Sequence, residues 1–149
     1  MAIYDVGMTQ EEIMASVEPA SPGTYRLTFE GFLVNEDRGD IFFPTKAGGK
    51  MVKARFRTSS PDPSQHGKSI LYNATIGAFT FANLCKALPI MERNGINSEV
   101  AIGMEIEAAV EIRYAAKNLD GSWTNIKSEN EADGREISKG NNISKMKAA

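Results

Sequence analysis

The stretch Lys50-Met-Val-Lys-Ala-Arg-Phe-Arg57 alternates between two kinds of side chain. Successive side chains of a β-strand point to opposite faces, so this pattern predicts a strand with one apolar and one basic face. The apolar face, which fits a core, holds Val52, Ala54 and Phe56. The basic face holds Met51 and the cations Lys53, Arg55 and Arg57, which lie about 6.5–7 Å apart in an extended strand. That repeat is close to the phosphate spacing of an extended nucleic-acid strand; an ordinary solvated strand face is the alternative.

The composition of the whole chain is that of one ordinary domain. Its 149 residues are 42% hydrophobic, which is enough for a packed core. The net charge of −2 excludes a strongly basic nucleic-acid binder as a description of the whole chain. The charge is uneven, however: residues 40–70 hold six cations and two acids, a net +4, and residues 92–136 hold ten acids and five cations, a net −5. The chain can therefore form two surfaces of opposite charge.

Three regions are predicted along the chain. Residues 1–20 form an N-terminal arm with a short helix over about Gln10–Val17, because Thr9 and Glu12 make a capping-box pair and Pro19 ends the pattern. So short a helix needs a docking surface, on its own domain or on a neighbouring subunit. Residues 21–128 form the folded domain. Residues 129–149 contain little apolar material and are predicted to be a C-terminal tail.

The elements expected in residues 21–128 have the order strand, strand, strand, helix, strand, strand. In the first strand Gly31 shifts the phase of the alternation, which indicates a bulge. The strands are expected at Thr24–Val34, Lys50–Arg57, Lys68–Thr75, Met104–Tyr114 and Ser122–Ser128, and the helix at Ile76–Leu88. This order predicts a mainly β fold, a five-stranded OB-type barrel with one helix between strands 3 and 4. An antiparallel sheet with one helix packed across it is the alternative.

Several short motifs in this order resemble a family of small phage-encoded OB-fold proteins that are similar to single-stranded-DNA-binding proteins. The matching pieces cover about residues 22–128 and are Pro22-Gly-Thr-Tyr25, Lys53-Ala-Arg-Phe-Arg57, Gly67-Lys-Ser-Ile70, the helix positions Phe79, Leu84, Ala87 and Leu88, Gly103-Met-Glu-Ile106, and Trp123-Thr-Asn-Ile-Lys127. The resemblance implies an OB fold and the binding of single-stranded DNA during phage DNA replication or recombination. Unlike many single-stranded-DNA-binding proteins, this chain lacks a strongly acidic C-terminal tail.

A sequence-independent single-strand site needs cations along the nucleic-acid backbone and aromatic faces on which bases stack. Besides Lys53, Arg55 and Arg57 on the basic face, Lys46 and Lys50 extend the basic surface into the preceding loop. Of Phe42 and Phe43, only one can face a core in an alternating strand, so the other is a candidate stacking platform. The further candidates are Tyr72, Trp123 and Lys127, and Trp123 can equally be a core residue.

The sequence favours a binding protein over an enzyme. It contains no P-loop, dinucleotide fingerprint or nucleophile elbow. One histidine and one cysteine give no metal-ligand cluster, so neither a metal nor a cofactor is expected. There is no signal peptide and no apolar run of membrane-spanning length, which predicts a cytoplasmic protein, in the host cytoplasm if it is phage-encoded.

The competing function is that of a non-enzymatic structural or assembly protein, such as a virion component or protein-interaction module, without nucleic-acid binding. The near-neutral charge, the N-terminal arm and the apolar Phe42-Phe43 segment all suit subunit contacts. The expected partners are single-stranded DNA, phage replication or recombination proteins, and further copies of the chain contacted through the N-terminal arm.

Overall fold

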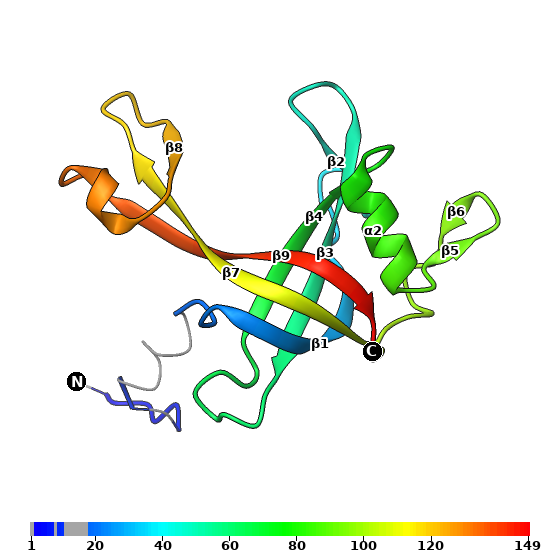
Figure 1. Ribbon diagram of the computed structural model, residues 1–149, viewed down its shortest axis with the longest axis horizontal. Helices are drawn as coiled ribbons and strands as arrows, with labels where there is room; N and C mark the ends of the chain where they lie inside the picture. The colour runs from blue at the N-terminus through cyan, green and yellow to red at the C-terminus, as the bar shows by residue number, and fades with distance from the viewer. Residues whose placement is uncertain (1, 8, 11–17) are drawn as a thin grey trace.

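The computed structural model describes residues 2–7, 9–10 and 18–149 (Figure 1). The helix predicted over about residues 10–17 lies outside these residues, Gln10 excepted. Within the described part of the chain, no helix is long and apolar enough to cross a membrane. The described elements are β1 (Gly23–Phe32), β2 (Phe43–Pro44), β3 (Lys50–Ser59), β4 (Ser69–Thr75), α2 (Phe79–Ala87), β5 (Met91–Glu92), β6 (Gly95–Ile96), β7 (Glu105–Lys117), β8 (Trp123–Ile126), the 3-10 helix η1 (Glu129–Ala132) and β9 (Ile137–Ala148).

The fold is mainly β, as predicted, and is built on one antiparallel sheet. Its long strands follow the order β4-β3-β1-β7-β9, with β2 added beside β3 and β8 beside β7. The prediction of a closed five-stranded barrel is wrong in two respects: there are more strands, and the sheet stays open because β4 pairs only with β3 and β9 only with β7. Side chains of α2 line the gap between β4 and β9. β9 is also kinked there, since Lys145 has a φ of 52°.

The alternation of β3 is confirmed and supplies the centre of the core. Val52, Ala54 and Phe56 are fully buried, and Phe56 packs on Phe29 of β1 with ring centroids 5.5 Å apart. The bulge predicted at Gly31 is confirmed too, because the β1–β3 register shifts between Phe29 and Gly31. Gly31 has a φ of 108°, a conformation that residues with a Cβ rarely adopt. The bulge lets the long strand β1 pair with β3 on one side and with β7 on the other.

The predicted helix between the third and fourth long strands is confirmed as α2. It begins three residues later than expected because Gly77, with a φ of 88°, turns the chain after β4. It ends before Pro89, where Leu88 returns to extended backbone. The buried residues Leu84 and Ala87 hold the helix on the core.

The C-terminal residues differ most from expectation. Where the sequence predicted a tail over residues 129–149, the structure has η1 and β9, and β8 is consequently not the last strand. β9 pairs with nearly the whole of β7 and contributes Ile143, only 9% exposed, to the core. The Asn141 side chain also holds the start of the domain: its Oδ1 accepts from the Ala20 N–H (3.0 Å), and its Nδ2 donates to the Ala20 carbonyl (2.9 Å).

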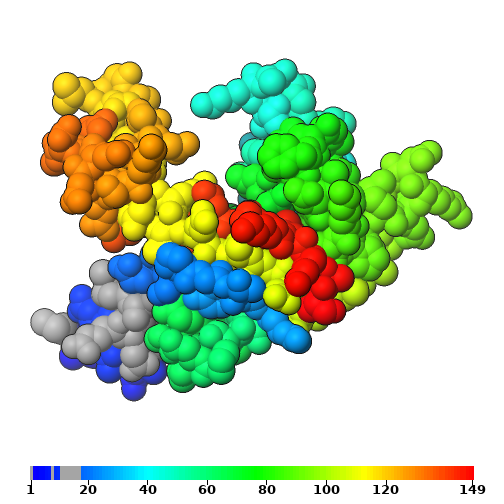
Figure 2. Space-filling view, viewed as in Figure 1, coloured from blue at the N-terminus to red at the C-terminus, as the bar shows by residue number. Residues whose placement is uncertain are grey.

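Two extensions project from the sheet on the same side (Figure 1). One is the connection between β1 and β3, residues 33–49, which we call the long loop. The other, which we call the arm, spans residues 112–141 and consists of the ends of β7 and β9 with β8 and η1. Figure 2 shows a hollow between the arm, drawn in yellow and orange, and the long loop, drawn in cyan.

Candidate nucleic-acid interface

The basic side of β3 lies on the outside of the sheet and continues onto β4. Strand pairing sets Lys53 beside Asn73 and Arg55 beside Leu71. Because directly paired residues share a face, these side chains form one outer surface. Leu71 is 46% exposed there although it is aliphatic. We call this surface, together with Phe43, the β3–β4 face.

The structure decides between the two adjacent phenylalanines. Phe42 packs against the hydrophobic core. Phe43 pairs with Met51, whose side chain is on the outer side of β3, so its ring belongs to the β3–β4 face. The Lys53 ammonium lies 4.5 Å from the centroid of the Phe43 ring. An aromatic face and a cation are thus in direct contact on the surface, which is the combination that stacks a base and attracts a phosphate.

The cations of β3 differ in how far they are neutralised. Arg57 donates to the Glu30 carboxylate (3.0 Å) and to the Gly67 carbonyl (2.8 Å), so its charge is largely compensated. Lys53 and Arg55 have no ion pair among the described residues. Of the basic stripe predicted from the sequence, Lys53 and Arg55 thus keep uncompensated charges among the described residues, whereas the charge of Arg57 is largely compensated.

The long loop is held by the nearly buried Asn35. Its backbone N–H donates to the Asp40 carbonyl (2.7 Å), and its side-chain amide donates to the Phe42 carbonyl (2.8 Å). The Asp40 carboxylate accepts from the Phe42 N–H (2.9 Å), and this bond, followed by contact with Arg38, lowers the pKa of Asp40. These bonds fix the direction in which the chain enters β2 and so place Phe43.

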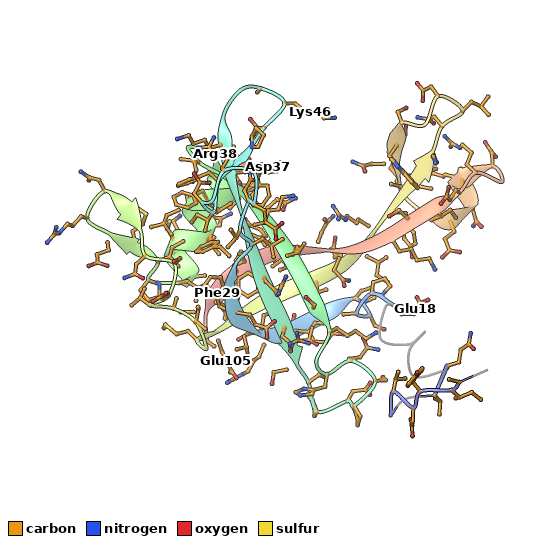
Figure 3. The ribbon with its side chains drawn as sticks, turned by 180° about the vertical axis from the view of Figure 1, so that it is seen from behind. Glu18, Phe29, Asp37, Arg38, Lys46 and Glu105 are labelled. Atoms are coloured by element: carbon orange, nitrogen blue, oxygen red, sulfur yellow. The ribbon has the colours of Figure 1, made fainter. Side chains whose placement is uncertain are left out.

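Two further predicted cations lie on or beside the long loop. Lys46 is exposed at its tip, on the side of the arm (Figure 3). Lys50 is exposed at the start of β3, with its ammonium 5.3 Å from the centroid of the Phe42 ring. Lys46 extends the basic surface into the long loop. Lys50 alternates with Met51 and so lies on the same side of β3 as Val52, at the end of the strand and opposite to Lys53 and Arg55.

Tyr72 does not belong to the surface. It pairs with Ala54, so its side chain points into the core, where it is only 9% exposed. Its hydroxyl donates to the Thr80 carbonyl (2.9 Å), and burial raises the pKa of this phenol. The ring of Tyr72 therefore lies in the core and offers no open face to a base, so the structure does not bring this candidate onto the β3–β4 face.

A groove of about 470 Å³ continues from the β3–β4 face across the gap between β4 and β9. It is lined by Leu71, Asn73 and the edge of Tyr72 on β4, by Phe79 at the start of α2, by Glu111 and Arg113 of β7, and by residues 141–146 of β9. Phe79 is 76% exposed, which is unusual for so large an apolar side chain. The sequence did not identify these groove residues as site candidates. Phe79 was noted only as a position of the predicted helix.

Trp123 lies on the arm and not in the core. It is 47% exposed, and it contributes with Arg113 to a second, smaller cavity. Lys127 is exposed beyond the end of β8 and does not line that cavity; its backbone N–H donates to Glu131 (2.9 Å). The structure thus brings Lys53, Arg55 and Phe43 together on the β3–β4 face, with Lys46 on the adjoining long loop and Lys50 on the other side of β3, and it sets Trp123 on the arm, across the hollow.

Comparisons of the chain with protein-family models, curated proteins and solved structures found no match. The function must therefore be argued from this geometry.

Proposed function

We propose that the protein binds single-stranded DNA without sequence preference, on the β3–β4 face between the long loop and the arm. The observation that carries the proposal is the contact of Lys53 with the half-buried ring of Phe43 on the outer side of β3, beside the unneutralised Arg55. A base can stack on the ring while the two cations follow the phosphates. This mode of binding needs no side chain that hydrogen-bonds to the edge of a particular base, so it tolerates any DNA sequence.

The strand order supports the same surface. We infer an OB-type arrangement with an open seam, in which β1, β3, β4, β7 and β9 correspond to the five strands and α2 follows the third. OB folds are partly open barrels that bind oligonucleotides on the face of strands 2 and 3 and on the loops between strands 1 and 2 and strands 4 and 5. Here these parts are the β3–β4 face, the long loop and the arm. A role in phage DNA replication or recombination, with proteins of those processes as partners, completes the proposal.

Charge reversal of Lys53 and Arg55 tests the proposal. With Lys46, Lys53 and Arg55 each on one phosphate, the logarithm of the affinity for oligo-dT should fall against the logarithm of salt concentration with a slope of about −2.1. The double variant Lys53→Glu/Arg55→Glu should lose binding at low salt and still unfold cooperatively. The matched control is Lys86→Glu/Arg93→Glu, which changes the net charge equally at exposed positions on α2 and the β5–β6 turn. Undiminished binding by the Lys53/Arg55 variant, or equal loss in the control, would refute the site.

A structural or assembly role is the second candidate, and one observation favours it. The N-terminal segment exposes Ile3 (90%), Tyr4 (85%) and Val6 (69%), apolar side chains that suit contact with a further copy of the chain. Failure to bind any oligonucleotide at low salt, together with a concentration-dependent oligomer that the triple variant Ile3→Ser/Tyr4→Ser/Val6→Ser dissociates, would favour this function over DNA binding.

A further inference from the structure

One face of the arm encloses a small cavity. Arg113 and Ala115 of β7 pair with Gly140 and Ser138 of β9, and Asn125 of β8 pairs with Ala115 from the other side. Trp123, two residues before Asn125, shares that face. The cavity measures about 230 Å³ and is lined by Arg113, Ala115, Trp123, Asn125, Ser138 and Gly140.

Gly140 makes room for the Arg113 side chain. A Cβ at residue 140 would lie 2.8 Å from Arg113 Nε, closer than a Cβ approaches a neighbouring atom, and 3.3 Å from Arg113 Nη2, which is a tight contact. The guanidinium group therefore lies across β9 at the position where this strand has no side chain. The backbone of Gly140 does not itself require glycine, since its φ is not positive. The glycine matters here for the space it leaves.

The lining combines three kinds of group that together suit one nucleotide. The indole of Trp123 offers a face for base stacking, and the Arg113 guanidinium offers paired donors for a phosphate. The Asn125 amide and the Ser138 hydroxyl can hydrogen-bond to a base edge or sugar. No acidic residue lines the cavity among the described residues. Its volume is below the roughly 300–1,000 Å³ of drug-sized sites, which limits the occupant to about one base.

We propose that this cavity binds one unstacked nucleotide of single-stranded DNA, with the base against Trp123 and a phosphate on Arg113. The inference rests on the proposed function and adds a second place at which the DNA strand contacts the protein. Arg113 lines both this cavity and the groove beside Leu71 and Phe79. A strand that leaves the β3–β4 face can therefore follow the groove to the arm without leaving the surface.

The protein has a single tryptophan, so fluorescence excited to the red of the tyrosine absorption band reports on this cavity alone. The experiment titrates the full chain with fluorescently labelled oligo-dT and records the anisotropy of the oligonucleotide and the emission of Trp123. The expected result is quenching of Trp123 that follows the anisotropy curve. An anisotropy change without any change in Trp123 emission would overturn the nucleotide site and leave the proposed function standing. The absence of any anisotropy change would overturn both.

The variant Gly140→Ala separates the role of Arg113 from that of the fold. The new methyl group can be accommodated by moving the flexible end of the Arg113 side chain, so stability should change little. We expect a 5- to 30-fold weaker affinity for oligo-dT, which corresponds to about 1–2 kcal/mol, with unchanged thermal unfolding. The matched control is Gly95→Ala in β6, where the added Cβ would lie 3.9 Å from its nearest neighbour, at ordinary contact distance. Equal affinities of the Gly140→Ala and Gly95→Ala variants would refute the role of Arg113.

Discussion

Substitution of the two adjacent phenylalanines should separate stability from binding. Phe43 lies on the outer face over Lys53, whereas Phe42 packs against the core. Phe43→Ala removes one stacking platform, which is worth about 1–3 kcal/mol per base. Since about 1.4 kcal/mol corresponds to a factor of ten in affinity, the dissociation constant for oligo-dT should rise between about 5-fold and 150-fold.

The assay is fluorescence anisotropy of labelled oligo-dT at fixed salt, with urea unfolding of each variant measured in parallel. Phe43→Ala should keep nearly the wild-type stability, and Phe43→Trp should keep nearly the wild-type affinity because it retains an aromatic face. Phe42→Ala should instead lower the urea midpoint, because it removes a ring packed on the core. Wild-type affinity in Phe43→Ala, or weaker binding only in proportion to lost stability, would refute the assignment of Phe43 as the stacking platform.

Three further predictions concern the fold around the site. Tyr72→Phe removes the hydrogen bond to the Thr80 carbonyl and should lower the free energy of unfolding by about 0.5–1.5 kcal/mol without changing affinity for DNA; weaker binding at unchanged stability would return Tyr72 to the site. Ile143→Ala should cost about 2–4 kcal/mol in urea unfolding, because the side chain is buried; a neutral effect would contradict the place of β9 in the core. Because the folded-state pKa of Asp40 is lowered, its contribution to the long loop is full above the ordinary carboxyl pKa of about 3.9 and is lost as pH falls through the lower folded value. An NMR titration of the Phe42 amide should show its transition below that ordinary value, and a midpoint at or above it would contradict the hydrogen bond.

The sequence predicts those parts of the fold in which the residue pattern of a single strand reflects which of its side chains are buried. Val52, Ala54 and Phe56 alternate with polar residues because β3 has one buried face, and Gly31 marks the bulge because the backbone there needs positive φ. β9 carries no such signal. Its only deeply buried side chain is Ile143, and it is held by backbone pairing to β7 and by Asn141. Pairing between distant segments of mixed composition leaves little periodicity to detect.

The same distinction explains which site residues could be found. The cations of β3 follow from alternation within one strand, and the choice between Phe42 and Phe43 follows only from the register of β2 against β3. Arg113 was missed because it lies in a strand whose outer face is mostly acidic. The cavity it lines becomes visible only when Gly140, far along the chain, is placed beside it.

The NMR chemical-shift map of the protein on addition of oligo-dT tests the proposed DNA-binding surface most directly. Binding there should give the largest shifts at Phe43, Lys53, Arg55 and Leu71, with a second group at Trp123 and Arg113 on the arm. Shifts confined to residues outside the β3–β4 face, groove and arm, or no shifts at a low salt concentration, would contradict the claim that this surface binds single-stranded DNA.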